Sequence, residues 1–143
     1  MSDGEWRELL RPLLDAAGLG ADIVAVEALT GGVSSDIVRV ELGDGRRVCA
    51  KRALPRLKVA SFWEAPLERN HHEAAWLRLA GALAPGLAPQ VLAEDRERGV
   101  LLLEYLPPDD YALWKSELLA GRFDSGIAER IAAALGRIHA ATW

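Results

Sequence analysis

The stretch that decides the fold is Leu29-Thr-Gly-Gly-Val-Ser-Ser-Asp-Ile37, read together with Lys51 further along the chain. It predicts a strand, a glycine turn with small hydroxyl residues, a second strand, and a third strand that holds the lysine. Glycine lets a backbone approach an anion closely, because a side chain would hold the anion away. Free N–H groups and serine hydroxyls in such a turn can donate to phosphate oxygens, and the lysine supplies a fixed positive charge. The stretch therefore predicts a phosphate-binding turn.

Length and composition allow one soluble globular domain. Of the 143 residues, 50% are hydrophobic and 27% are charged, which is ordinary for a folded domain with a single core. The net charge of −4 gives no general electrostatic reason to bind nucleic acid. The single cysteine, Cys49, excludes an internal disulfide and a cysteine-based zinc site.

Nothing in the chain predicts export or a membrane partner. The acidic start, Met1–Glu5, lacks the basic and apolar regions of a signal peptide. The longest apolar runs, such as Val100–Leu103, are too short to cross a bilayer. We therefore expect a cytoplasmic protein.

The first element predicted is an amphipathic helix over residues 3–17. Ser2 and Glu5 have the spacing of a capping box, and Gly18 is a suitable residue to end the helix. Pro12 disagrees with this pattern, because proline removes an intrahelical hydrogen bond, and we expect it to kink or split the helix.

Three strands are predicted next, over residues 22–29, 33–42 and 46–54, with a hairpin turn at 43–45. A connector follows over 54–59. A helix should begin near Ser61, which has a capping-box partner in Glu64, or near Pro66, and it should end before Pro85.

Two further strands, over 89–94 and 99–105, and two C-terminal helices complete the prediction. The first of these helices should run from Asp109 or Asp110 to Leu119, and the second from Asp124 or Ser125 towards the terminus. This order is not a βαβ repeat. It predicts an α+β fold, in which a five-stranded antiparallel sheet packs against one helix, with an N-terminal helix and C-terminal helices.

Five motifs in this order carry a family resemblance: 29–35 (LTGGVSS), 48–51 (VCAK), 69–73 (RNHHE), 102–107 (LLEYLP) and 135–139 (LGRIH). From about residue 22 onward, the chain resembles the N-terminal lobe of the aminoglycoside phosphotransferase and choline kinase group, within the protein-kinase-like fold. The resemblance implies a nucleotide-binding lobe over residues 1–106. Residues 107–143 would then be helices after the hinge, at the start of a C-terminal lobe.

The resemblance also implies roles in binding ATP. Leu29 and Ile37 would sandwich the adenine, and Lys51 would contact the α- and β-phosphates while Glu73 holds it in place. Cys49, two residues before Lys51, would share its strand face and line the adenine pocket. The remaining residues implied are the phosphate lid, made by Gly31, Gly32, Ser34 and Ser35, and the hinge, where backbone groups of Glu104 and Leu106 would read the adenine edge.

Taken singly, each of these features has a simpler interpretation. Two glycines between strands are usually only a turn, and a lysine on a strand usually faces solvent. Glu73 alone would be a solvated helix residue, and Cys49 a small buried hydrophobe. The three histidines, His71, His72 and His139, are not accompanied by other candidate metal ligands and would be structural or surface residues. Only their joint order favours the kinase-like interpretation.

Parts of the family pattern do not occur in these residues. The family's catalytic loop has a His-Gly-Asp core, with an asparagine five residues after the Asp and a later magnesium-binding Asp, whereas this sequence passes from His139 to Trp143 without them. We therefore expect a fragment of a larger small-molecule O-phosphotransferase that binds ATP but is not catalytic alone. Mg²⁺ and the small-molecule acceptor would bind only with a C-terminal lobe.

One alternative and one further expectation complete the sequence-based predictions. The alternative is a non-catalytic module that binds a nucleotide or a protein on the same scaffold. The final helix carries an apolar stripe that should be exposed and promote self-association: Ile127, Ile131, Leu135 and Ile138.

Overall fold

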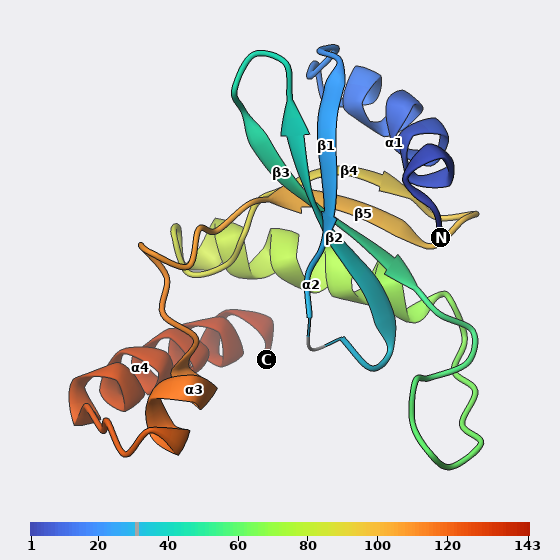
Figure 1. Ribbon diagram of the computed structural model, residues 1–143. Coiled ribbons are helices and arrows are strands. Elements are labelled where there is room, and N and C mark those ends of the chain that lie inside the picture. Colours follow the sequence, from blue (N-terminus) through green and yellow to red (C-terminus); the bar gives the residue numbers. More distant parts are fainter. Residues whose placement is uncertain (31) are drawn as a thin grey trace.

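The structure is a computed structural model that describes residues 1–30 and 32–143 (Figure 1). Gly31, a predicted lid residue, lies outside the described residues. The elements follow the order α1 (Asp3–Ala16), β1 (Ile23–Ala28), β2 (Ser35–Leu42), β3 (Arg47–Ala53), α2 (Arg69–Leu83), β4 (Val91–Asp95), β5 (Val100–Glu104), α3 (Trp114–Leu119) and α4 (Ser125–Thr142).

The five strands form one sheet in the order β1-β2-β3-β5-β4, and every neighbouring pair is antiparallel. Helices α1 and α2 lie on opposite faces of this sheet (Figure 1). The predicted α+β class, with its five-stranded antiparallel sheet, is confirmed. Each strand also lies within two residues of its predicted bounds.

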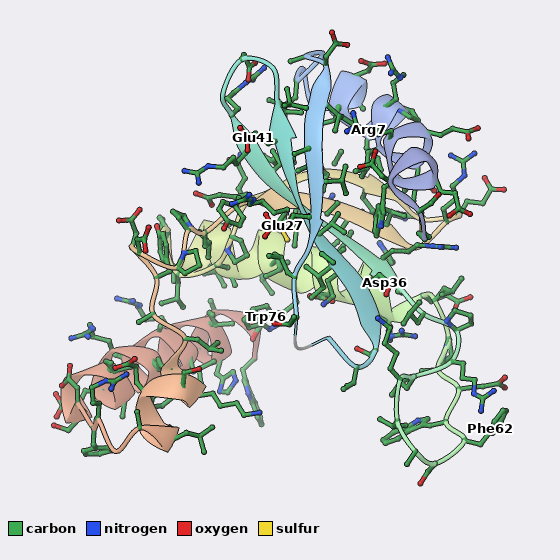
Figure 2. The ribbon with its side chains drawn as sticks, viewed as in Figure 1. Arg7, Glu27, Asp36, Glu41, Phe62 and Trp76 are labelled. Carbon is green, nitrogen blue, oxygen red and sulfur yellow. The ribbon has the colours of Figure 1, made fainter. Side chains whose placement is uncertain are left out.

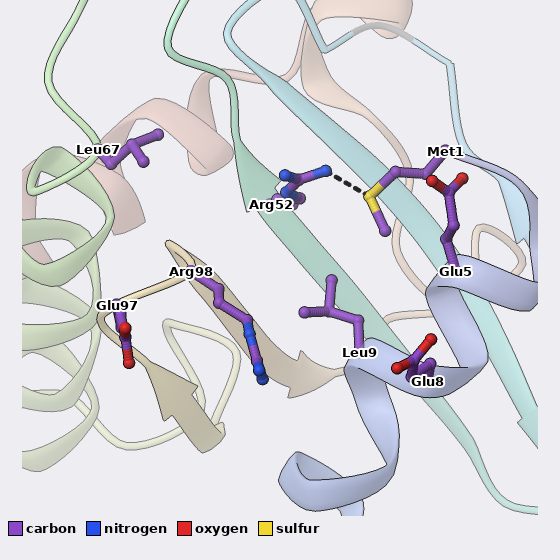
Figure 3. Close-up of a pocket in the computed structure, with 8 residues that line it drawn as sticks. All are labelled: Met1, Glu5, Glu8, Leu9, Arg52, Leu67, Glu97 and Arg98. Atoms are coloured by element: carbon purple, nitrogen blue, oxygen red, sulfur yellow. Dashed lines mark hydrogen bonds between the residues drawn. The ribbon is translucent and has the colours of Figure 1, made fainter.

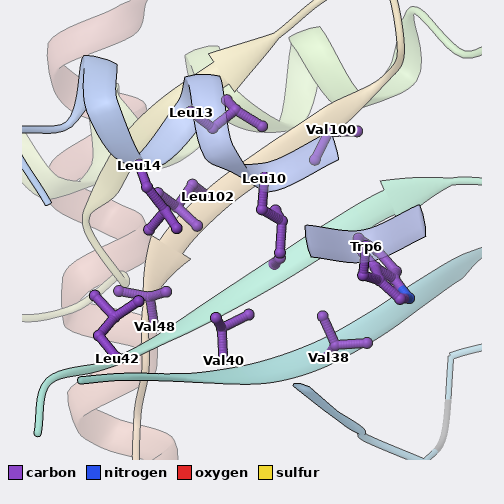
Figure 4. Close-up of a cluster of buried hydrophobic side chains, with 11 residues drawn as sticks. Trp6, Leu10, Leu13, Leu14, Val38, Val40, Leu42, Val48, Val100 and Leu102 are labelled. Atoms are coloured by element: carbon purple, nitrogen blue, oxygen red, sulfur yellow. The ribbon is translucent and has the colours of Figure 1, made fainter. Parts of the chain in front are cut away.

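The larger core lies between the sheet and α1 (Figure 4). Helix α1 buries Trp6, Leu10, Leu13 and Leu14, and Leu10 has no exposed surface. These side chains pack on alternate residues of the central strands: Val38, Val40, Leu42, Val48, Ala50, Val100 and Leu102. Because side chains alternate across a strand, the residues between these positions face α2.

Helix α1 begins as predicted, with a complete Ser2–Glu5 capping box, and Gly18 follows its end with a left-handed φ of 68°. The expectation that Pro12 splits this helix was wrong, because the helix runs through Pro12 to Ala16. Pro12 and Glu8 both lie on the exposed side. The carbonyl that loses its intrahelical partner therefore stays accessible to water, which reduces the cost of the proline.

Helix α2 begins at Arg69, so the predicted start near Ser61 or Pro66 was wrong. Backbone hydrogen bonds within residues 54–68 explain the difference. Leu57 N–H donates to Trp63, Ala65 N–H donates to Pro55, and Arg56 forms a bridge with Glu64. The segment therefore folds back on itself as an irregular loop, with Phe62 68% exposed at its far end (Figure 2).

The C-terminal helices follow the last strand. Helix α3 begins at Trp114 and not at Asp109 or Asp110, because the N–H groups of Asp110 and Tyr111 close a turn on the carbonyl of Pro107. Asp124 caps α4 as predicted, accepting from the N–H of Gly126 at 2.8 Å.

Helix α4 packs against α2. Ala134 and Ile138 are buried, at 0% and 3% exposure, whereas Leu135 is 39% exposed. The apolar stripe predicted on this helix is therefore only partly open in the structure. Within the part of the chain that the structure describes, no helix is long and apolar enough to span a membrane.

Candidate functional site

The candidate site lies on the α2 face of the sheet. Ile37, Lys51 and Leu101 are direct partners across β2, β3 and β5. Residues opposite one another in an antiparallel sheet project to the same face. Since Leu101 belongs to the cluster that packs with Ala74 of α2, Ile37 and Lys51 share the face that α2 covers.

Lys51 is held by Glu73 of α2. Its Nζ lies 2.6 Å from both carboxylate oxygens. The two side chains remain 21% and 36% exposed, so solvent still reaches the pair. An ammonium group has three N–H donors, and two directed at one carboxylate leave a third that can donate to an anion. The structure therefore brings together the two charged residues that the sequence predicted as partners.

The glycine turn is closed by backbone contacts. The N–H of Leu29 donates to the carbonyl of Ile37 at 2.9 Å. At Gly32, a Cβ atom would lie 2.6 Å from the carbonyl oxygen of Ser35. That distance is shorter than any ordinary contact, so this position needs glycine for the close approach of its own backbone.

The two predicted lid serines differ in their surroundings. Ser35 is the first residue of β2, lies opposite Ala53 and is only 3% exposed. Ser34 is half-buried, and its carbonyl accepts from the N–H of Leu54 at 3.0 Å. The structure therefore leaves Ser34 more accessible to a ligand than Ser35.

Cys49 lies on the same face as Lys51, as expected from its place two residues earlier. It is half-buried and packs against the cluster of Ala74, Leu101 and Leu103. Burial raises the pKa of the Cys49 thiol, and the charge of Lys51 only partly opposes this effect. The thiol is therefore less reactive at neutral pH than an exposed cysteine.

The predicted hinge follows β5. Glu104 ends the strand opposite Val48, and its N–H donates to the carbonyl of Gln90 at 2.9 Å. The side chain of Glu104 accepts from the N–H of Gln90 at 3.1 Å. Leu106 follows and is half-buried. Glu104 is thus occupied in joining β5 to the segment before β4.

Residues that sequence reasoning did not assign hold α2 in place. Arg69 donates to four backbone carbonyls, and the buried Asn70 donates to the carbonyl of Gly99 at 2.6 Å. The motif 69–73 had been noticed, but only Glu73 received a role. The contacts with Ser34, Leu54 and Gly99 join segments far apart in the chain, so no local spacing pattern could reveal them.

Glu94 on β4 is a second anchor that the sequence did not reveal. Its carboxylate is only 7% exposed and lies 2.8 Å from both Nδ1 of His71 and Nη1 of Arg78, which are on α2. Burial alone would raise the pKa of Glu94. The hydrogen bonds from Arg78 and His71 outweigh it, and the pKa lies below its ordinary value. Glu94 therefore ties α2 to the sheet edge as a carboxylate.

The hollows in the surface do not coincide with the Lys51–Glu73 pair. One of about 350 Å³ is bounded by the glycine turn, but Trp6 and Val38, which belong to the α1 core, also line it. Another, of about 470 Å³, lies beside Glu5, Glu8 and Arg52 (Figure 3). Arg52 follows Lys51 on β3 and so points to the other face. The second hollow therefore opens on the α1 side, whereas the first is bordered by residues of both faces, since Ile37 also lines it.

Comparison with known proteins identifies the group to which this geometry belongs. Residues 25–142 match the family model of the phosphotransferase enzyme family. The chain belongs to the phosphotransferase enzyme family. The predicted resemblance to the aminoglycoside phosphotransferase group is thereby confirmed.

Two similar proteins have kinase names. A methylthioribose kinase of Yersinia enterocolitica serotype O:8 / biotype 1B is 34% identical over 87 residues, which are 60% of this chain and 21% of that protein. A crystal structure of a protein described as a fructosamine-3-kinase, from Thermobifida fusca YX-ER1, is 23% identical with a TM-score of 0.48, over 71% of this chain and 32% of that one. The chain thus spans about a fifth and a third of these relatives.

Among residues 1–30 and 32–143, no three His, Cys, Asp or Glu side chains gather in a way that could hold a metal ion.

Proposed function

We propose that this phosphotransferase family member binds ATP on the α2 face of its sheet and provides the nucleotide-binding part of a small-molecule O-phosphotransferase. The observation that carries the proposal is the Lys51–Glu73 pair at 2.6 Å. In kinase-like enzymes a lysine of the third strand, held by a helix glutamate, must be in place for phosphoryl transfer. Bound ATP supplies the phosphoryl group.

The residues of the site fit an adenine nucleotide in their chemistry. Leu29, Ile37 and Cys49 offer apolar or weakly polar surface to a base, and Lys51 offers an N–H donor and a positive charge to phosphate oxygens. Glu73 holds the lysine side chain in one geometry. Positioning of this kind matters because phosphoryl transfer depends mainly on orientation and electrostatics.

The acceptor and the metal ion would bind mainly to residues other than those of this site. We expect a hydroxyl-bearing small molecule, and the similarity to a methylthioribose kinase favours a sugar-like acceptor. Mg²⁺ would bind with ATP through groups of a C-terminal lobe. Residues 1–143 alone should therefore bind ATP weakly and transfer no phosphoryl group. We place the protein in the cytoplasm, where ATP is available.

An NMR titration of ¹⁵N-labelled residues 1–143 with ATP tests the proposal. ATP should shift amide signals on the α2 face, at residues 32–37, 49–51 and 104–106. Adenosine should shift the hinge and strand signals but leave the glycine turn almost unchanged. Shifts confined to the α1 side, or none at millimolar ATP, would contradict the proposal. No shifts with ATP, together with binding of a protein partner, would favour a non-catalytic module.

A further inference from the structure

We infer that Arg69 is a positioning residue that ties the glycine turn to the start of α2, the helix that also holds Lys51 through Glu73. The inference rests on the proposed function for its consequence, which is tighter binding of the triphosphate. Its structural part, the restraint of the turn, can be measured without any nucleotide.

The guanidinium group of Arg69 joins three segments of the chain. It donates to the carbonyls of Ser34 at 2.5 Å and Leu54 at 2.7 Å, and to those of Ala65 and Pro66 at 2.8 Å each. Ser34 belongs to the glycine turn, Leu54 follows β3, and the other two precede α2. One half-buried side chain therefore holds the turn, the end of the lysine-bearing strand and the entry to the helix together.

Backbone hydrogen bonds complete this junction. The carbonyl of Ser34 accepts from the N–H of Leu54 at 3.0 Å as well as from Arg69. The carbonyl of Val33 accepts from the N–H of Lys58 at 2.7 Å. The two amides of Leu54 and Lys58 therefore report directly on whether the turn is held against the 54–68 segment.

Arg69 and Glu73 are four residues apart and thus lie on one face of α2. Glu73 fixes Lys51 on β3, while Arg69 fixes Ser34 in the turn. Both parts of the predicted phosphate site are therefore hydrogen-bonded to the same helix, through residues one helical turn apart. A shift of α2 would move the turn and the lysine together, whereas loss of Arg69 would loosen the junction of the turn, Leu54 and the helix entry and leave the Lys51–Glu73 pair in place.

Arginine is the residue type that this junction needs. Its planar guanidinium carries five N–H donors in a fixed arrangement, whereas lysine has three donors on one flexible nitrogen atom. An Arg69→Lys substitution keeps the charge and part of the packing but cannot reach all four carbonyls. An effect of this substitution would therefore come from the lost hydrogen bonds to the turn and not from a change in the charge of the site.

Hydrogen exchange measured by NMR tests the restraint. In Arg69→Lys, the amides of Leu54 and Lys58 should exchange at least about tenfold faster than in the unchanged chain, while amides of the central strands keep their rates. Arg78→Lys is the matched control, because Arg78 lies on the same helix and contacts Glu94 at the other sheet edge. Equal rates at Leu54 and Lys58 in Arg69→Lys would overturn the inference.

Ligand affinity tests the consequence. The Arg69→Lys variant should bind ATP about tenfold more weakly than the unchanged chain, because the phosphates of ATP then contact a turn that is less restrained. Its affinity for adenosine should equal that of the unchanged chain. Equal losses for ATP and adenosine, or an unchanged ATP affinity with faster exchange, would overturn the positioning role. If the unchanged chain binds neither ligand, the proposed function fails, and the exchange rates alone then support or overturn the restraint.

Discussion

The two faces of the sheet are built in different ways. The α1 face is apolar, and Trp6, Leu10, Leu13 and Leu14 pack on valine and leucine side chains of the central strands (Figure 4). The α2 face has a smaller cluster formed by Ala74, Leu101 and Leu103. Polar contacts also join this side of the molecule to the helix: Lys51–Glu73, Asn70–Gly99, Arg69–Ser34 and His71–Glu94.

This difference predicts that the two faces contribute unequally to folding stability and to ligand binding. Burial of apolar side chains contributes most to the free energy of folding, so the α1 face should hold the fold together. Polar ties contribute less net stability but fix geometry. On the α2 face, Lys51 and Glu73 also remain partly open to solvent. We therefore expect substitutions on the α1 face to lower stability most, and substitutions of the Lys51–Glu73 pair on the α2 face to lower binding more than stability.

The largest expected loss of stability is on the α1 face. Leu10→Ala removes a side chain with 0% exposure from the centre of the larger core, and it should lower the free energy of unfolding by about 3 kcal/mol. Denaturant unfolding followed by circular dichroism measures the change. Val24→Ala, on a residue 57% exposed, is the control and should change it by less than about 0.5 kcal/mol. Similar losses for both variants would contradict the packing account.

A smaller, pH-dependent loss is expected on the α2 face. Glu94→Gln removes the charge that His71 and Arg78 contact, and it should lower the free energy of unfolding by about 2 kcal/mol at pH 7. The folded-state pKa of Glu94 lies below the ordinary value of 4.5. The contribution of the carboxylate is therefore fully present above that value and is lost as the pH falls through the folded pKa.

Unfolding curves of both proteins between pH 7 and pH 3 check this sign. The difference between the unchanged chain and Glu94→Gln should shrink as the pH falls below 4.5. A difference that does not shrink below pH 4.5 would mean that Glu94 is not held as a carboxylate. In that case the α2 face would not depend on this anchor.

The smallest effect expected is a change in the labelling rate of Cys49. A small thiol reagent should modify this half-buried residue slowly, since burial raises the pKa of its thiol and the thiolate is the reacting form. The rate should rise with pH, and saturating adenine nucleotide should slow it further at constant pH. A rate that nucleotide does not change would remove Cys49 from the adenine pocket.

Short-range patterns in the sequence predicted most of the fold. Alternating apolar residues and the turn at Gly43–Gly45 predicted β2 and β3, and the Ser2–Glu5 spacing predicted the start of α1. The same reasoning failed for the start of α2. Ser61 and Glu64 have capping-box spacing, but backbone pairing within residues 54–68 keeps both residues in a loop. Local propensity was overridden there by contacts within that loop.

The candidate site was predictable only in part. Lys51 and Glu73 could be paired because a family pattern joins them, and the structure places their charged atoms 2.6 Å apart. Arg69 and Glu94 carried no such pattern. Their partners lie on segments well separated in the chain, from Ser34 to Arg69 and from His71 to Glu94. Such contacts depend on how the helix sits on the sheet, which spacing alone does not specify.

The most direct test of the division between the two faces is Lys51→Ala, with ATP affinity and unfolding measured in one buffer. The Lys51–Glu73 pair is partly exposed, so its loss should lower the free energy of unfolding by less than about 1 kcal/mol. ATP affinity, measured by calorimetric titration, should fall at least about tenfold. An unchanged ATP affinity, or a loss of stability as large as that of Leu10→Ala, would contradict the account.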